Sequence, residues 1–355
     1  MMAMQQIETP QTGSPKNVQP LLRITGLTTE FRLEGGRRLQ AVQDVDLDIG
    51  AGEILGLVGE SGSGKSVFAQ SILRLVQPPG QVVAGAIAFE GRSVMDMSAR
   101  ELSRWRGRDV GMIFQQPQSC LNPVRRIGWQ VAEPLLLQEK LSRKAAWAGA
   151  VDLLRAVGIP APEEKVLAYP HQLSGGQAQR VMIAIALALK PKLLIADEPT
   201  TALDVTIQAQ ILELLRESCR MLGTSLLLVT HDLGVVARLA DRVAVMYAGR
   251  IVEEGPVETM LTAPAHPYTQ GLIGAAPQLG QARGVRLKDI PGTIPDLSRL
   301  GAGCAFAPRC DARAGQNLES CTLSQPLPVS IRPRHRALCF AAKASSAVSP
   351  CEISP

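Results

Sequence analysis

Apolar residues are spaced in two ways along the chain, and each spacing predicts a different kind of strand. From Leu21 to Ile49 they come in short stretches on either side of a glycine pair, which is typical of antiparallel strands joined by a turn. Unbroken apolar runs at 53–58, 193–196 and 225–229 indicate strands buried on both faces. The pattern therefore predicts one antiparallel sheet and one parallel sheet.

Helical periodicity fills the stretches between these runs. Residues 67–76 and 208–221 are predicted helices, and the second separates two buried strands as in a βαβ unit of an open parallel sheet. Between Pro117 and Leu189 the spacing is helical with interrupting prolines, which predicts a helical insertion in the sheet. Shorter strands are predicted at 86–89 and 110–114, and a closing hairpin at 243–252.

These changes of pattern divide the chain. Residues 1–20 are polar and lack the basic start and apolar run of a signal peptide, so a disordered lead-in is expected. An α/β domain is expected at 21–276, with the helical insertion as a subdomain at about 116–189. From 277 to 345 glycine and proline increase and long periodic segments stop, which predicts a small irregular C-terminal domain, followed by a tail at 346–355.

Composition narrows the class of protein. A chain of 355 residues with 46% hydrophobic and 19% charged residues is globular and suits one large or two unequal domains. The net charge is +5, but no block of basic residues is present, so no nucleic-acid partner is expected. The longest apolar run, 181–189, is about half of the ~20 residues that a membrane-crossing helix needs.

A glycine-rich segment lies between the first buried strand and the first predicted helix. Its sequence, GESGSGKS, matches the phosphate-binding pattern G-x-x-x-x-G-K followed by Ser or Thr. Glycines let backbone N–H groups converge on phosphate oxygens, whereas a simple turn has no use for an embedded Lys65-Ser66 pair. Lys65 is expected to reach the β- and γ-phosphates, and Ser66 to ligate Mg²⁺. The other expected phosphate contacts are Gly59, Ser61, Gly62, Ser63 and Gly64.

Two acids end the buried strand at 193–196. Asp197 is expected to hold Mg²⁺ through water, and Glu198 to polarise the water that attacks the γ-phosphate. A helix N-cap by Asp197 is the alternative, and it is disfavoured because a phosphate-binding loop is already present.

A second anion site and an adenine contact are suggested by less specific features. Ser174 suits an N-cap, and Gly175 and Gly176 before Gln177 would expose backbone N–H groups to phosphate. Alone, this segment is equally consistent with a capped helix start. Phe31 could stack on an adenine ring, and it could equally be a buried aromatic residue of a strand.

With Leu173, residues 174–177 spell LSGGQ, and here the chain resembles the ATP-binding-cassette ATPases. That resemblance implies a phosphate-loop NTPase core with an antiparallel β subdomain and a helical subdomain, and a head-to-tail dimer around two ATP molecules. It also implies that Gln115 bridges Mg²⁺ and a transmembrane partner, and that His231 contacts the γ-phosphate. The loop Thr201-Ala202-Leu203-Asp204 would communicate across the dimer, with Asp204 near the nucleotide. The sequence departs from the family pattern at Gln116 and Ala178, neither of which is a catalytic position.

Further motifs resemble the ATP-binding subunits of dipeptide and oligopeptide importers. They are YPHQ before the signature, HPYT at 266–269, Ala276-Pro277, IPGTIP at 290–295 and GCAFAPRC at 303–310. The resemblance implies an ATPase that powers import of peptides or a related solute from the cytoplasmic face of the cell membrane. Implied partners are a paralogous ATP-binding subunit, two transmembrane permeases and an extracytoplasmic solute-binding protein. The alternative is a soluble cassette ATPase of DNA repair or translation, but such chains usually carry two cassettes or long insertions.

Five of the seven cysteines crowd the C-terminal region. Cys304, Cys310, Cys321 and Cys339 are predicted to bind one 4Fe-4S cluster, because the segment has little apolar periodicity to build its own core and the importer resemblance supports four cysteines. Zinc is the competitor, but its ligand pairs usually lie two to four residues apart. Reduced cysteines packed as small hydrophobes are the third reading. Cys351 is expected to be a bystander.

Overall fold

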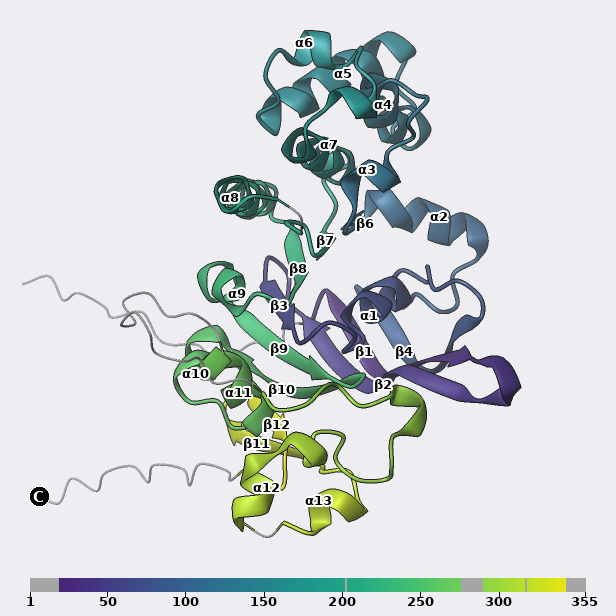
Figure 1. Ribbon diagram of the computed structural model, residues 1–355. Helices are drawn as coiled ribbons and strands as arrows, with labels where there is room; N and C mark the ends of the chain where they lie inside the picture. Colours follow the sequence, from purple (N-terminus) through teal and green to yellow (C-terminus); the bar gives the residue numbers. More distant parts are fainter. Residues whose placement is uncertain (1–18, 202, 276–289, 317, 343–355) are drawn as a thin grey trace, which may run out of the picture.

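The computed structural model describes residues 19–201, 203–275, 290–316 and 318–342, and two β-sheets form its frame (Figure 1). A four-stranded sheet has the order β2-β1-β4-β5, and an eight-stranded sheet has the order β11-β12-β10-β9-β3-β8-β7-β6. The strands are β1 (Leu22–Arg32), β2 (Arg38–Ile49), β3 (Ile54–Val58), β4 (Gly80–Phe89), β5 (Arg92–Ser93), β6 (Val110–Ile113), β7 (Leu193–Asp197), β8 (Ser225–Thr230), β9 (Arg242–Tyr247), β10 (Arg250–Pro256), β11 (Pro328–Arg332) and β12 (His335–Leu338).

Helices cover the larger sheet and form a projection above it, while α12 and α13 lie at the opposite end of the view (Figure 1). The helices are α1 (Lys65–Ile72), α2 (Ala99–Arg108), α3 (Pro117–Cys120), α4 (Ile127–Leu137), α5 (Arg143–Ala156), α6 (Pro162–Lys165), α7 (Gly175–Leu187), α8 (Val205–Leu222), α9 (Leu233–Leu239), α10 (Val257–Thr262), α11 (Pro267–Ala275), α12 (Asp311–Gln316) and α13 (Ser320–Leu323). Within the described ranges, no helix combines the length and the apolar character needed to cross a membrane.

The parallel part of the larger sheet brings several strand ends to one edge. β3 pairs in parallel with β8 and β9, and β7 pairs in parallel with β8 and β6. The predicted βαβ unit is present as β7, α8 and β8. Ligands of open α/β sheets bind outside the carboxyl ends of such strands, so this edge is where a site is expected.

The antiparallel prediction for the N-terminal part is also confirmed. β1 and β2 form the hairpin, with Leu22 opposite Ile49, and β4 pairs on the other side of β1. Buried side chains from this sheet, from β3 and from α1 form one apolar cluster, which includes Leu22, Leu55 and Phe68, each 0% exposed. This cluster fastens the antiparallel sheet over the helix that follows β3.

Helices α3–α7 build the projection around an apolar cluster that continues into the larger sheet and α8. Val131 of α4, Ala150 and Leu154 of α5, and Val181 of α7 are at most 1% exposed and belong to one cluster. Residues of α7 also pack with Leu194 and Ala196 of β7, so this helix joins the projection to the sheet.

The C-terminal region is less separate than its composition predicts. β11 and β12 form a hairpin, and β12 pairs with β10, with Glu253 opposite Ala337, so the hairpin extends the larger sheet. The two strands have five and four residues, which is too short for periodicity to reveal them. The predicted boundary at 276/277 and the tail at 346–355 lie outside the described residues, and so does the lead-in apart from residues 19 and 20.

A buried carboxylate holds this hairpin to the sheet. Glu253 of β10 is 0% exposed and accepts hydrogen bonds from the backbone N–H groups of Ala265 at 2.6 Å and His266 at 3.0 Å. Nε2 of His335, on β12, lies 2.8 Å from the same carboxylate. Three segments of the chain therefore meet at one buried carboxyl group, and a buried polar group without partners is strongly destabilising.

His266 makes this region sensitive to acid. The side chain is 1% exposed, its Nδ1 accepts the N–H of Tyr268 at 3.0 Å, and burial lowers its pKa to about 4. The unfolded chain binds a proton at His266 below about pH 6.5, but the folded chain does so only near pH 4. Stability is therefore fully present above pH 6.5 and is lost as the pH falls toward 4.

We expect this residue to contribute a loss of about 3 kcal/mol in the free energy of unfolding across that range, since one pKa unit corresponds to about 1.4 kcal/mol. Denaturant unfolding at several pH values measures it. His266→Asn keeps an acceptor near the position of Nδ1 but does not titrate, so it should reduce the slope. An unchanged slope in that variant would contradict the assignment.

Candidate active site

The loop at 59–64 connects β3 to α1. At two of its positions the surrounding backbone leaves no space for a side chain, so only glycine fits. A Cβ at Gly64, where φ is +105°, would lie 2.3 Å from the carbonyl oxygen of Ala41. A Cβ at Gly59 would lie 2.2 Å from the carbonyl oxygen of Met246. The close backbone approach explains these glycines and leaves the loop N–H groups and the N-terminus of α1 available to an anion.

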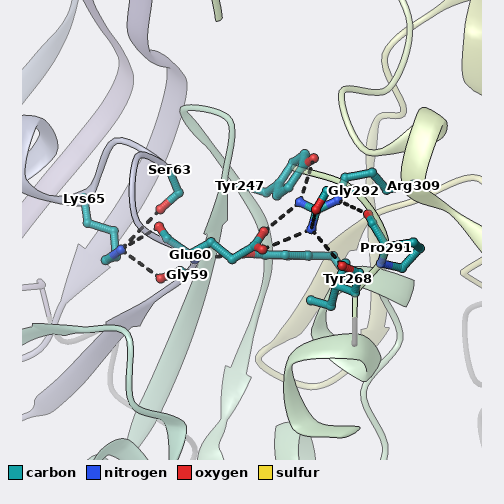
Figure 2. Close-up of polar contacts among 10 residues, drawn as sticks. Gly59, Glu60, Ser63, Lys65, Tyr247, Tyr268, Pro291, Gly292 and Arg309 are labelled. Carbon is teal, nitrogen blue, oxygen red and sulfur yellow. Dashed lines mark hydrogen bonds and ion pairs between the residues drawn. The ribbon is translucent and has the colours of Figure 1, made fainter. Parts of the chain in front are cut away.

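Lys65 lies folded back over the loop (Figure 2). Its Nζ donates to the carbonyl oxygens of Gly59 at 2.8 Å and Glu60 at 2.9 Å, and lies 3.4 Å from Oγ of Ser63. Burial lowers its pKa, while the nearby carboxylates of Glu198 and Asp197 act in the opposite direction. These acceptors hold the ammonium group at the loop, where phosphate oxygens can replace them.

Ser66 and Asp197 are brought together as the sequence analysis requires for a shared Mg²⁺ site. Oγ of Ser66 donates to Oδ1 of Asp197 at 3.0 Å, although the two residues are 131 positions apart. Burial raises the pKa of Asp197, and the hydrogen bond from Ser66 opposes this. A hydroxyl and a carboxylate fit Mg²⁺, which prefers oxygen ligands.

Glu198 is the centre of a second group. Its Oε2 accepts from Nε2 of Gln115 and Oγ1 of Thr201, both at 2.8 Å, and its Oε1 lies 3.2 Å from Nδ1 of His231. The backbone has φ of +46°, which is uncommon for a residue other than glycine and is frequent at functional sites. Its N–H donates to the carbonyl oxygen of Val229 at 2.9 Å, which fixes this conformation to β8.

This surrounding keeps Glu198 ionised. Burial acts to raise its pKa, but hydrogen bonds from Thr201 and His231 outweigh it, so the pKa lies below its ordinary value. A fixed carboxylate that is ionised at neutral pH can accept a proton from water. Thr201 was expected only as part of the loop at 201–204, and its hydrogen bond to Glu198 was not predicted. A hydroxyl side chain three residues after the expected catalytic acid could have suggested this contact.

The segment Ser174–Gln177 forms a capped helix start. Oγ of Ser174 accepts the N–H of Gln177 at 3.3 Å, and Oε1 of Gln177 accepts the N–H of Ser174 at 3.2 Å. Gly175 also lines a cavity of about 390 Å³ together with Gln115, Thr201 and Leu203. In the described part of the chain no hydrogen bond joins this segment to 59–66, and its contact with a nucleotide stays a prediction.

Phe31 and Asp204 have local contacts that account for them structurally. A Cβ at Gly80 would lie 2.5 Å from Cε1 of Phe31, so the half-buried ring packs against β4. Oδ1 of Asp204 accepts the N–H of Ile207 at 3.0 Å and caps α8. Their contacts with a nucleotide stay predictions.

The four C-terminal cysteines share a neighbourhood but do not form a metal site here. The N–H of Cys304 donates to the carbonyl oxygen of Cys321 at 2.7 Å. Burial raises the pKa of Cys304 to about 11, with contributions from Cys321 and Cys339. No group of three or more His, Cys, Asp or Glu side chains is placed to hold a metal ion among the residues that the structure describes. The described structure therefore gives no support to the predicted 4Fe-4S cluster, whose iron needs converging thiolates.

A phosphate-binding loop, an acidic pair on the neighbouring strand and a capped LSGGQ helix on a helical projection define an ATPase of the ATP-binding-cassette class. Comparison with known families agrees: the ABC transporter family matches residues 42–201, and the oligopeptide/dipeptide transporter C-terminal region matches 252–316. The chain belongs to the ABC transporter ATPases that carry this C-terminal region.

Individual relatives support this membership over most of the chain. A putative peptide import ATP-binding protein of Brucella melitensis is 49% identical, over 91% of this chain and 97% of the relative. The oligopeptide transport ATP-binding protein OppD of Bacillus subtilis is 52% identical, over 82% of each. A solved dimeric ATP-binding cassette in a post-hydrolysis state with ADP and Pi has a TM-score of 0.60 and 29% identity, covering 66% of this chain and 98% of that structure.

Substitutions at the two centres should separate nucleotide binding from hydrolysis. We expect Lys65→Ala to weaken ATP binding by roughly 10- to 100-fold, since it removes a charge-assisted hydrogen bond. Glu198→Gln should leave the Kd for ATP almost unchanged but lower kcat by about 10²- to 10⁴-fold, because it removes the proton acceptor. Nucleotide titration and phosphate release measure the two effects, and wild-type turnover in Glu198→Gln would refute the assignment of Glu198.

Proposed function

We propose that this chain binds and hydrolyses ATP to power the uptake of peptides through a membrane permease. The observation that carries the proposal is the carboxylate of Glu198, held by Gln115 and His231 beside the phosphate-binding loop. The C-terminal region and the printed names of the relatives, which refer to peptide import and oligopeptide transport, support the solute class.

In the proposed reaction, Lys65 and the loop N–H groups hold the β- and γ-phosphates of ATP. Ser66 and Asp197, with Gln115, would hold Mg²⁺, which would neutralise charge on the phosphate oxygens. Glu198 accepts a proton from the attacking water. The water oxygen bonds to the γ-phosphorus as the bond from that phosphorus to the β,γ-bridging oxygen breaks, and ADP leaves. His231 stabilises the γ-phosphate and, through its contact with Glu198, keeps that carboxylate in position.

Two such subunits are proposed to complete each other's sites. The segment Ser174–Gln177 of a partner subunit would close over the ATP held by residues 59–66 of this chain, as the resemblance to ATP-binding cassettes implies. A solved relative of this fold is dimeric and bound to ADP and Pi. We propose a paralogous ATP-binding subunit as the partner, with two permeases and an extracytoplasmic binding protein. The assembly would place this chain at the cytoplasmic face of the membrane.

Reconstitution tests this assembly. With the extracytoplasmic binding protein supplied, we expect ATP-driven peptide uptake into proteoliposomes only when this chain, a paralogous ATPase subunit and both permeases are present, because the subunit proposed to complete each ATP site is a distinct one. Glu198→Gln in the same mixture is the control for hydrolysis. Full uptake without the paralogue would rule out the heterodimer. Isolation of the chain from membranes with ribosomes or DNA, instead of permeases, would overturn the transport function.

The 4Fe-4S cluster stays a proposal from the sequence resemblance, supported by the spacing of the four cysteines. Their present arrangement would have to change as iron binds, as metal sites couple to local folding. We expect visible absorption and about four iron atoms per chain after anaerobic purification. Cys310→Ser should lose the iron, whereas Cys120→Ser, an exposed cysteine of α3, should retain it. Colourless wild-type protein without iron would refute the cluster, and stoichiometric zinc would assign the site to zinc.

A further inference from the structure

Glu60, the second residue of the phosphate-binding loop, is held at its side chain and at both backbone groups (Figure 2). Its carboxylate receives two hydrogen bonds from Arg309, from Nη1 at 2.8 Å and from Nη2 at 3.0 Å. Its N–H donates to the hydroxyl oxygen of Tyr268 at 2.9 Å. Its carbonyl oxygen accepts from Nζ of Lys65 at 2.9 Å. One residue therefore connects the phosphate-binding lysine to a side chain 249 positions away.

Arg309 is itself fixed by the C-terminal region. Its side chain is 5% exposed, and Nε donates to the carbonyl oxygen of Pro291 at 2.7 Å. Further donations reach the carbonyl oxygens of Gly292 at 3.3 Å and Ile290 at 3.4 Å. The guanidinium group is thus saturated by backbone acceptors on one side and by Glu60 on the other, so its position follows the backbone at 290–292.

An aromatic cluster supports the same contact. Tyr247 of β9 packs against Tyr268 of α11 at 4.6 Å between ring centroids, and against Phe306 at 5.3 Å. Phe306 belongs to the C-terminal region, and the hydroxyl oxygen of Tyr247 lies 3.4 Å from Nη1 of Arg309. The rings shield the guanidinium group of Arg309, which is 5% exposed, although the Glu60 side chain is 30% exposed.

The geometry favours arginine specifically. A planar guanidinium group can donate two parallel hydrogen bonds to one carboxylate, whereas a lysine ammonium acts as a point charge. Two parallel bonds restrict the orientation of Glu60 as well as its distance. Glu60 directly follows Gly59, whose backbone lies so close to Met246 that a Cβ there would be 2.2 Å from the Met246 carbonyl oxygen, so this restriction acts where the loop leaves β3.

We infer that Arg309 is a positioning residue for the phosphate-binding loop: by holding Glu60, the C-terminal region keeps the loop in the shape that receives the phosphates of ATP. The inference rests on the proposed function, and it adds a residue that acts from outside the nucleotide site. A loop that is ordered before ATP arrives spares binding the cost of ordering it. Coupling of this kind is reciprocal. A ligand or partner that displaces Arg309 would weaken ATP binding by some factor, and ATP would weaken the binding of that ligand or partner by the same factor.

The test is nucleotide affinity and steady-state ATPase activity of the full chain. Arg309→Gln should raise the Kd and the KM for ATP by about tenfold, within the 5- to 150-fold typical of coupling between sites, and change kcat by less than about twofold. Arg309→Lys should recover only part of the affinity. Arg299→Gln is the matched control, because Arg299 lies in the same region but is 78% exposed and pairs only with Asp296 in the described contacts.

A double-mutant cycle identifies the route of the effect. If Arg309 acts through Glu60, then Arg309→Gln should add almost nothing to the rise in KM already caused by Glu60→Gln. Tyr268→Phe keeps the ring but removes the acceptor for the Glu60 N–H, and it should raise KM about threefold. This variant provides the readout if Arg309→Gln fails to fold. Thermal unfolding separates a lost fold from a misplaced loop.

The outcomes distinguish this inference from the function on which it depends. Wild-type affinity in a folded Arg309→Gln variant, or additive effects in the cycle, would overturn the positioning role alone. A wild-type chain that binds no ATP would overturn the positioning role together with the proposed function. A rise in KM shared by Arg309→Gln and Tyr268→Phe, and absent from Arg299→Gln, would establish the positioning role of Arg309.

Discussion

The parallel pairing of β3 with β8, and of β8 with β7, sets the geometry on which the site depends. The register places Val58 opposite Thr230, and Val229 opposite Asp197, so the three strands end at one level. The phosphate-binding loop, the acidic pair and His231 all begin within two residues of these ends. Backbone hydrogen bonds therefore determine how far Ser66 lies from Asp197, and a slip of one residue would turn the Asp197 side chain to the other face of the sheet.

Two carboxylates near this edge of the sheet, those of Glu198 and Glu60, have different contacts and different proposed roles. Glu198 gathers donors from three separate elements, through Gln115, Thr201 and His231, and faces the position where chemistry would occur. Glu60 gathers Arg309 and faces away from it, toward the C-terminal region. One carboxylate is held so that it can take up a proton, whereas the other transmits the position of a distant segment to the loop.

The predictable parts of this protein are those whose evidence is local in the sequence. The loop around Lys65 and the acids after β7 could be assigned because strand, motif and helix follow one another directly. The contact between Arg309 and Glu60 could not, because 249 positions separate them and neither residue type is unusual where it stands. The buried pair of Glu253 and His335 was missed for the same reason, since burial of a polar side chain depends on tertiary packing.

The attachment of β12 to β10 has a consequence for how cassettes of this kind can be recombined. The oligopeptide/dipeptide transporter C-terminal family matches 252–316, and the β11–β12 hairpin lies beyond that match. This hairpin covers an edge of the larger sheet that would otherwise offer unpaired backbone groups to other chains. Nε2 of His335 on this hairpin also lies 2.8 Å from the carboxylate of Glu253 on β10. The region is therefore not an interchangeable module. An exchange between transporters, by recombination or by design, has to carry Glu253 and Glu60 together with the residues that pair with them.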